Sequence, residues 1–280
     1  NTNKVGSYSA TITYEGISNT FNYEVIEKVI LNPLKSINLN KTSGTKYIGE
    51  TENLTVIYNP SNTTDNKNVT WTSSNNNVAS INNGVVTAKG IGNAVITAKV
   101  GSLTASYKIT VIKHDNPVIV KANILTYNGK EQELITVSNI KGNICYSYNP
   151  ISSCSTNESI PKKINAGEYT VYYFVSGDNN YNSKSGSIKV NINKKSGSIS
   201  YLNKSITKTQ GDQAFTNVLT KTGDGIINYS SSDNKVATID KNGKVTILSS
   251  GNTVIKAIVI DGENYFYNIK EASYTLTVNK

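Results

Sequence analysis

Short runs of alternating apolar and polar residues recur along the chain, separated by turn-forming residues. Alternation at period two over five or more residues predicts strands with one buried face. The clearest runs are Tyr8 to Tyr14, Ala94 to Ala98, Ile188 to Ile192 and Ala272 to Val278. Asn83-Gly84 and Asn242-Gly243 predict hairpin turns, because such turns need positive φ. The predicted fold class is all-β, built from short antiparallel strands.

One stretch of this pattern occurs twice. Val69 to Ala98 returns as Ile227 to Ala257 with one extra residue in the turn, so that Gly84 corresponds to Gly243. Repeated positions usually form the framework of a fold, and the paired apolar positions are therefore predicted to be core. These are Trp71, Val78, Ile81, Val86 and Ile96 in the first copy, and Tyr229, Val236, Ile239, Val245 and Ile255 in the second.

The first copy resembles the bacterial immunoglobulin-like domain of group 2. The resemblance is carried by Trp71, Ser73-Ser74, Val78-Ala79, Gly84, Val86-Thr87-Ala88, Gly92 and Ile96-Thr97-Ala98, and it extends over about Pro33 to Lys113. The second copy is similar but weaker, with Tyr229 as its aromatic and Lys256 where the family usually has Thr. The resemblance implies tandem immunoglobulin-like β-sandwiches, which we expect to be arranged as an elongated rod.

Two further segments resemble related modules. Val5 to Tyr8 and Ile12 to Gly16 are similar to the closing strands of a group 3 bacterial immunoglobulin-like domain, of which they cover about a third. Asn165 to Tyr173 and Gly177 to Asn182 resemble an immunoglobulin-like repeat of bacterial surface proteins. The predicted domains are a hairpin of a truncated domain at 1–32, a group 2 domain at 33–114, a β module at 115–194 and a group 2-like domain at 195–280.

Composition supports several small domains and gives little sign of nucleic-acid binding. The 280 residues suit about three immunoglobulin-sized units. The net charge is +9, but the lysines are scattered and the chain has no arginine. Because specific reading of bases depends heavily on arginine, we expect no nucleic-acid partner. A diffuse positive surface can still attract an anionic cell-wall polymer.

The residues needed for catalysis are scarce. His114 is the single histidine and falls in a predicted linker, where a solvated role is expected. The sequence contains no serine-hydrolase, zinc-protease, P-loop or dinucleotide motif. We therefore predict that the chain is not an enzyme and has no catalytic residues, no cofactor and no metal site, although turn carboxylates leave calcium open. The tyrosine-rich turns Asp178 to Tyr181 and Gly262 to Tyr267 could stack on sugar rings.

Both cysteines lie in the predicted middle module. Cys145 and Cys154 flank a turn at Asn149-Pro150. Their spacing does not match Cys-x-x-Cys redox chemistry, and two cysteines with one distant histidine make a poor zinc site. The alternatives are a disulfide that staples the hairpin, expected if the protein is exported, and two unlinked thiols.

The resemblances together imply an exposed part of a bacterial cell-surface or secreted protein. No apolar run reaches the ~20 residues of a membrane helix, and the chain has the features of a segment of a longer, extracellular protein, monomeric by itself. A non-catalytic spacer that supports adhesion is the expected function. The alternatives are an adhesive module that binds host glycan or matrix protein through end loops, and an accessory segment of a secreted polysaccharide- or wall-degrading enzyme. The parent protein, the ligand and the anchoring mode stay open.

The core assignment of Trp71 predicts a large effect on stability. Replacing Trp71 by Ala is expected to lower the free energy of unfolding by roughly 3–5 kcal/mol, as for other large core aromatics. Urea denaturation of the variant and the parent chain measures this loss. A change below about 1 kcal/mol would place Trp71 on the surface and favour a ligand site there.

Overall fold

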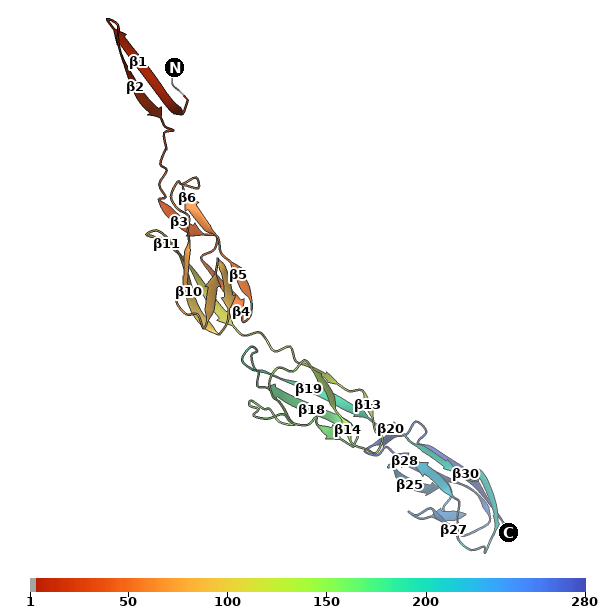
Figure 1. The fold of residues 1–280 in the computed structure, drawn as a ribbon. Coiled ribbons are helices and arrows are strands. Elements are labelled where there is room, and N and C mark those ends of the chain that lie inside the picture. The colour runs from red at the N-terminus through yellow and green to blue at the C-terminus, as the bar shows by residue number, and fades with distance from the viewer. Residues whose placement is uncertain (1–3) are drawn as a thin grey trace. The chain divides into compact units, whose positions relative to one another are not determined.

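A computed structural model describes residues 4–280. These residues form thirty β-strands and no helix, which confirms the all-β class (Figure 1). Within the described range no helix is therefore long and apolar enough to cross a bilayer. The chain divides into two compact units, residues 1–114 and 115–280. The division into four domains stays a prediction, and each unit is described by itself.

The first unit begins with a two-stranded hairpin. Strand β1 (Gly6–Tyr14) pairs antiparallel with β2 (Ile17–Val25), and Glu15 and Gly16 at the turn both have positive φ. One face of the ribbon is polar and the other is apolar apart from Asn19, because the two strands alternate at period two. The apolar side chains of Ile12 and Phe21 are 64% and 53% exposed, so nothing within the described chain covers them.

The rest of the first unit is a β-sandwich of two packed layers. One layer is the sheet β4 (Ser43–Tyr47), β11 (Leu103–Ile112), β10 (Gly92–Val100) and β7 (Thr70–Ser73), in that order. The other contains β5 (Thr51–Asn53), β9 (Val85–Ala88) and β8 (Ala79–Asn82), beside the pair β3 (Ser36–Leu39) and β6 (Val56–Asn59). Val86, Ile96, Tyr107 and Ile109 fill the core between the layers.

The second unit begins with the middle module. Its larger sheet has the order β13 (Leu125–Thr126), β19 (Lys184–Asn193), β18 (Gly167–Val175) and β16 (Ile144–Ser147). Two short ladders complete it: β12 (Ile119–Ala122) with β15 (Ile135–Ser138), and β14 (Gln132–Glu133) with β17 (Lys162–Lys163). Leu134, Ile135, Val171 and Ile192 are fully buried between them.

The C-terminal sandwich repeats the topology of the first. Its main sheet has the order β22 (Ser205–Thr209), β30 (Glu271–Asn279), β28 (Gly251–Ile260) and β25 (Ile226–Ser231). The facing strands are β23 (Phe215–Thr216), β27 (Lys244–Ile247) and β26 (Ala237–Ile239), with β21 (Ser198–Tyr201) paired to β24 (Leu219–Thr222). A further short pair is β20 (Lys195–Ser196) with β29 (Tyr265–Phe266).

In all three sandwiches an early strand pairs in parallel with the last strand. The parallel pairs are β4 with β11, β13 with β19, and β22 with β30. Parallel strands run in the same direction, so the chain passes along each sandwich from one end and leaves towards the other. The remaining strand pairs within each sandwich are antiparallel, apart from the short β20–β29 pair.

Contacts between an aromatic ring and a glycine explain one part of the sequence repeat. Trp71 lies against Gly84, and Tyr229 lies against Gly243. Both glycines have φ of 83°, a left-handed conformation that side chains disfavour. A β-carbon on Gly84 would lie 3.6 Å from the Trp71 ring, and one on Gly243 would lie 3.2 Å from the Tyr229 ring. The aromatic and the glycine recur together because each occupies the space that the other leaves.

Turn hydrogen bonds explain another part of the repeat. The Val95 amide donates to Ser74 Oγ at 2.9 Å, and the equivalent Val254 amide donates to Ser232 Oγ at 2.8 Å. Just beyond, Asn75 and Asp233 each accept a backbone amide two residues on through a side-chain oxygen. Short polar side chains that satisfy neighbouring backbone groups favour such turns. The Ser-Ser and Asx positions are thus fixed by local structure.

The ten predicted core positions lie in or against the two hydrophobic cores. Val78, Val86, Ile96, Val236, Val245 and Ile255 are buried, whereas Trp71, Ile81, Tyr229 and Ile239 are partly buried and pack against the buried set. Because Trp71 keeps part of its surface in water, the stability loss on its replacement is expected towards the low end of the range given above.

The two repeated glycines predict unequal costs of substitution. Gly84→Ala introduces positive-φ strain and places a β-carbon 2.6 Å from the Leu54 carbonyl oxygen, which is backbone and cannot rotate away. Gly243→Ala carries the same strain, but the nearest atoms to its β-carbon belong to the Tyr229 side chain, at 3.2 Å or more. We expect Gly84→Ala to cost about 2–4 kcal/mol and Gly243→Ala about 1–2 kcal/mol. For Gly84→Ala, urea denaturation followed by Trp71 fluorescence measures the loss of stability. For Gly243→Ala, amide hydrogen exchange in β27 measures it.

Gly101→Ala is the matched control, because Gly101 also has positive φ, at 58°, but no atom lies within 4 Å of its added β-carbon. It separates strain from steric conflict within the same sandwich. A loss at Gly101 equal to that at Gly84 would show that the contact with Leu54 contributes nothing.

Candidate functional site

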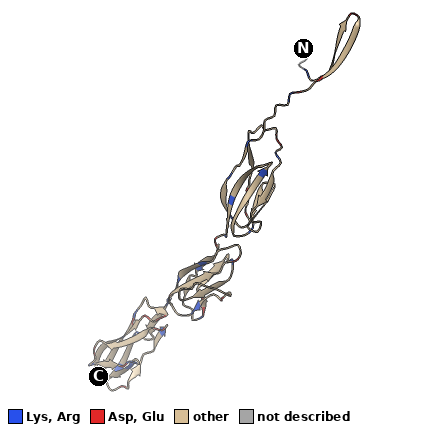
Figure 2. Ribbon diagram, turned by 90° about the vertical axis from the view of Figure 1, so that its left-hand side faces the viewer, with Lys and Arg blue, Asp and Glu red and all other residues tan. Residues whose placement is uncertain are grey.

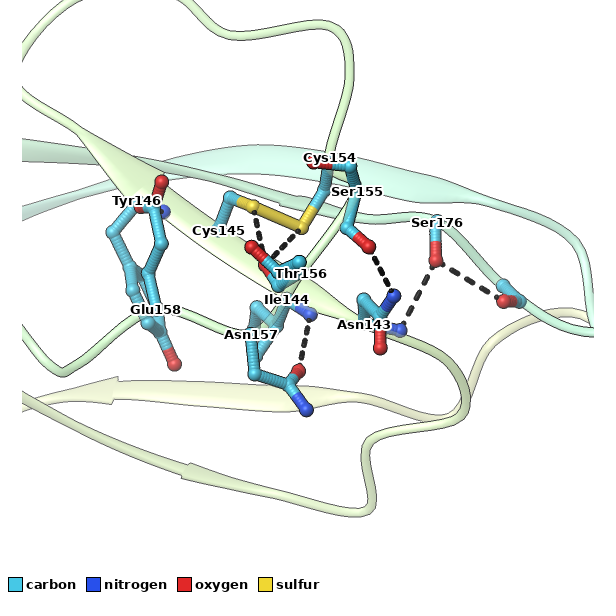
Figure 3. The surroundings of a disulfide bond; sticks show 11 residues. Asn143, Ile144, Cys145, Tyr146, Cys154, Ser155, Thr156, Asn157, Glu158 and Ser176 are labelled. Atoms are coloured by element: carbon cyan, nitrogen blue, oxygen red, sulfur yellow. Dashed lines mark hydrogen bonds between the residues drawn. A yellow bond between two sulfur atoms is a disulfide. The ribbon is translucent and has the colours of Figure 1, made fainter.

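The most chemically distinctive site of the chain is the disulfide on the middle module. Cys145 lies in β16 and Cys154 in the loop that follows, with Cα atoms 5.5 Å apart and the sulfurs bonded (Figure 3). Of the two alternatives left by the sequence, the structure therefore contains the disulfide. No other cysteine exists in the sequence, so no free thiol remains.

The loop that follows β16 carries Cys154 and, just beyond it, Asn157 and Glu158, and we call it the disulfide loop. It lies along an open sheet edge. Strand β16 is the last strand of its sheet and pairs only with β18. Its outward amides are satisfied by two side chains of the loop: Ile144 N–H donates to Asn157 Oδ1 and Tyr146 N–H donates to Glu158 Oε2, both at 2.9 Å. The Glu158 amide returns a bond of 3.0 Å to the Ile144 carbonyl. The loop therefore occupies the positions that an added strand would take.

Two neighbouring contacts hold the rest of the loop. Asn143 Nδ2 donates to the Ser155 carbonyl at 2.7 Å (Figure 3). The sulfurs of Cys145 and Cys154 lie 3.0 and 3.2 Å from the Thr156 carbonyl oxygen. These last two are close contacts and not hydrogen bonds, because a disulfide sulfur carries no proton to donate.

A covered edge has a physical purpose. Unpaired amides and carbonyls at the margin of a sheet invite pairing with another chain, and proteins protect such margins with loops, charges or bulges. Here the cover is made of Asn157 and Glu158, and the disulfide ties the loop that carries them. The geometry supports a protective role and no redox catalysis, since the cysteines lack the Cys-x-x-Cys spacing.

Three tyrosine hydroxyls are buried without a hydrogen-bond partner among the described atoms: Tyr107, Tyr201 and Tyr274. Burial raises the pKa of Tyr274 to about 12 and also raises the pKa values of Tyr201 and Tyr107. The rings of Tyr201 and Tyr274 pack edge to face with centroids 4.7 Å apart. Phenols held neutral inside a core serve packing, and they cannot act as bases or nucleophiles near neutral pH.

His114 differs from its expected solvated state. Its ring stacks on Tyr47 with centroids 4.6 Å apart, and Nε2 lies 3.2 Å from the Ile48 carbonyl oxygen. This contact could not be predicted from local sequence, because Tyr47 is distant from His114 along the chain. Within the described residues, no three His, Cys, Asp or Glu side chains group as metal ligands.

The tyrosine-rich turns are also engaged internally. Tyr267 is buried, and its hydroxyl donates to the Thr222 carbonyl at 2.8 Å. Tyr265 packs edge to face against Tyr127 with centroids 5.6 Å apart. Lys141 Nζ lies 5.5 Å from the centre of the Tyr181 ring. The turn from Gly262 to Tyr267 therefore has a structural use that sequence reasoning missed, and Tyr267 cannot stack on a sugar.

Comparison with known families agrees with the two repeated sandwiches. Residues 33–111 match the model for the bacterial Ig-like domain (group 2). Residues 215–260 match the model for the intimin immunoglobulin-like domain. The chain carries bacterial immunoglobulin-like domains. The resemblances of residues 1–32 and 115–194 to other immunoglobulin-like modules stay predictions.

Two bacterial relatives share part of the sequence. Intimin of Escherichia coli O157:H7 is 41% identical over 58 residues, which are 21% of this chain and 6% of intimin. An uncharacterized protein of Clostridium acetobutylicum is 29% identical over 105 residues, which are 36% of this chain and 11% of that protein. The matched parts are thus a small fraction of both relatives.

Several solved structures show a loose likeness. The I-band fragment I67–I69 of titin has a TM-score of 0.30 and 13% identity, and the match covers 88% of this chain and 98% of that one. Domains 1–6 of the surface layer protein SbsC have a TM-score of 0.30 and 14% identity, covering 98% and 45%. Drosophila N-cadherin EC1–4 has a TM-score of 0.28 and 12% identity, covering 98% and 83%.

The covered edge predicts a specific response to reduction. Protein purified from an oxidising compartment is expected to show no free thiol, and the closed loop is expected to contribute about 2–3 kcal/mol in the chain-entropy model. On reduction the amides of Ile144 and Tyr146 should lose hydrogen-exchange protection, because Asn157 and Glu158 are no longer held beside them. Mass spectrometry and amide exchange measure both effects.

The control lies in the same sheet. Val171 is fully buried in β18, next to the edge strand, and its amide should stay protected if reduction opens only the edge. Unchanged protection of Ile144 and Tyr146 after full reduction would show that the loop stays in place without its disulfide.

Proposed function

We propose that the chain is a non-catalytic spacer segment of a bacterial cell-surface or secreted protein, where it supports adhesion by holding other parts away from the envelope. The observation that carries this proposal is the parallel pairing of an early strand with the last strand in each sandwich. A chain that enters one end of a module and leaves by the other gains length with every module it adds.

The cores support the same proposal. Each hydrophobic cluster is made of residues from one sandwich: Leu39 to Val111 in the first, Val118 to Ile192 in the middle and Ile199 to Val278 in the last. A module that buries its own apolar residues does not depend on its neighbour for folding. Such modules can be joined in series, as a spacer requires.

The charge distribution suits a solvated surface. Lysines are spread over the length of the chain in Figure 2 and are not collected on one element. Isolated surface lysines keep a protein soluble and attract polyanions weakly. We propose an anionic cell-wall polymer as a loose, non-specific partner of this surface.

An adhesive module is the second candidate, and one feature favours it. A depression of about 540 Å³ lies at one end of the first sandwich, between the loop with Asp65 and Asn68 and the turn with Ser102 and Leu103. Backbone and amide groups there could hydrogen-bond a sugar. A glycan-array screen of the chain tests this candidate, and specific binding that is lost in Asn68→Ala would favour it over the spacer.

An accessory role in a secreted polysaccharide- or wall-degrading enzyme is the third candidate. It shares the extracellular setting with the other two, and the sandwiches themselves do not discriminate between them. The sequence of the complete parent protein decides this point. A hydrolase domain would favour the accessory role, and a wall-anchor signal would favour a spacer or an adhesin.

The spacer proposal predicts an extended particle in solution. Three sandwiches of about 40 Å placed end to end give a radius of gyration of about 35 Å, whereas one compact body of this chain length would give about 19 Å. Small-angle X-ray scattering of the monomer at several concentrations measures this radius. A value near the compact figure would mean that the modules pack into one body, and the spacer function would be refuted.

A further inference from the structure

The first and last sandwiches differ at one connection that lies just beyond the repeated stretch. In the first sandwich β10 and β11 are joined by the two-residue turn Gly101-Ser102. In the last sandwich the equivalent strands β28 and β30 are joined by the ten residues Asp261–Lys270, which include β29. Because the flanking strands are otherwise equivalent, the longer connection is an addition to the shared framework. We call Asp261–Lys270 the clasp loop.

The clasp loop is held firmly by its own domain. The Asp224 carboxylate accepts the amides of Asn264 at 2.8 Å and Tyr265 at 3.2 Å. The Tyr267 hydroxyl is buried, donates to the Thr222 carbonyl and accepts the Gly225 amide at 3.1 Å. Because the Asp224 carboxylate and the Tyr267 hydroxyl both anchor the clasp loop, its remaining polar groups are held in a fixed arrangement.

Those remaining groups contact the preceding module. Asn264 Oδ1 accepts the Ala166 amide at 2.8 Å, and Glu263 Oε1 accepts Asn165 Nδ2 at 2.9 Å. The Gly262 carbonyl accepts Lys194 Nζ at 2.6 Å. Gly262, Glu263 and Asn264 thus each accept a hydrogen bond from the middle module, and Tyr265 packs against Tyr127 of that module.

Asn264 is the centre of this contact. Its side chain and backbone are only 9% exposed, and its carbonyl also accepts the Lys195 amide at 2.9 Å. A buried amide that loses its partner carries a desolvation penalty, so separating the two modules would leave unpaired groups on both sides. The contact therefore opposes separation as well as rotation.

The attachment points are spread over three strands of the middle module. Ala166 precedes β18, Lys194 follows β19, and Tyr127, which packs on Tyr265, follows β13. Contacts at the ends of three neighbouring strands of one sheet restrict movement about the short connection from Lys194 to Gly197.

We infer that the clasp loop is a docking surface for the end of the middle module, and that it makes residues 115–280 one rigid body in solution. The partner end is defined by the Asn165-Ala166 turn and the Lys194 side chain. A rigid joint of this kind is equally compatible with a spacer and with an adhesin, so the inference stands apart from the proposed function.

Residual dipolar couplings of the full chain test the joint. Backbone couplings from β18–β19 and from β28–β30 are expected to fit one alignment tensor in the native protein. In Asn264→Ala each set should still fit its own domain, but the two sets should require different tensors. The Ala166 amide should also exchange about tenfold faster or more, as its acceptor is lost. Asn234→Ala is the matched control, since Asn234 is an exposed asparagine on another loop of the same domain.

A second variant approaches the joint from the other module. Asn165→Ala with Lys194→Ala removes two contacts without changing any residue of the C-terminal domain, and it should also separate the two tensors, less completely. This variant decides the matter if Asn264→Ala does not fold. Two different tensors in the native chain, or a single tensor that survives both variants, would overturn the inference.

Discussion

Each sandwich depends on the parallel pairing of one early strand with its last strand. The early strand forms one edge of the main sheet, and the pairing places it beside the last strand of the same module. Because the early strand and the last strand run in the same direction, the two ends of a module lie apart. In the first and last sandwiches the pair extends over five residues, from Ser43 to Tyr47 and from Ser205 to Thr209. In the middle module it is only Leu125 and Thr126.

The remaining features protect what this arrangement leaves open. A sheet closed on one side still has an edge on the other, and in the middle module that edge, β16, is covered by Asn157 and Glu158 on the disulfide loop. The ends of the modules are the second exposed region. Within residues 115–280, the end of the middle module hydrogen-bonds the C-terminal sandwich through Asn264. The equivalent connection of the first sandwich is only the turn Gly101-Ser102.

Local sequence signals predicted the local structure well. The alternation from Ala94 to Ala98 and the pairing of Trp71 with Gly84 in the repeat both reflect contacts between residues close in sequence or in register, and the all-β class followed from them. The disulfide was one of two alternatives, because spacing alone cannot fix the redox state.

The features that the sequence did not predict depend on contacts between residues far apart along the chain. A short polar run such as Ser43 to Tyr47 carries no local signal that it pairs with a strand some sixty residues later. The stacking of His114 on Tyr47 depends on the same pairing. The clasp loop was interpreted as a possible sugar platform because it is rich in tyrosine, and its use in docking depends on Asn165 and Ala166, about a hundred residues away.

The modules have separate cores, and we expect each to resist extension until the parallel pair that closes it is sheared. Single-molecule force spectroscopy of the full chain, held at its two termini, measures this resistance. We expect three separate unfolding events, each releasing about 250 Å of chain at ~3.6 Å per residue. The event of the middle module should be shorter by about 30 Å while the disulfide is intact, because the nine-residue span between Cys145 and Cys154 stays closed. A smooth extension without discrete events, or one event that releases all three modules together, would contradict the account.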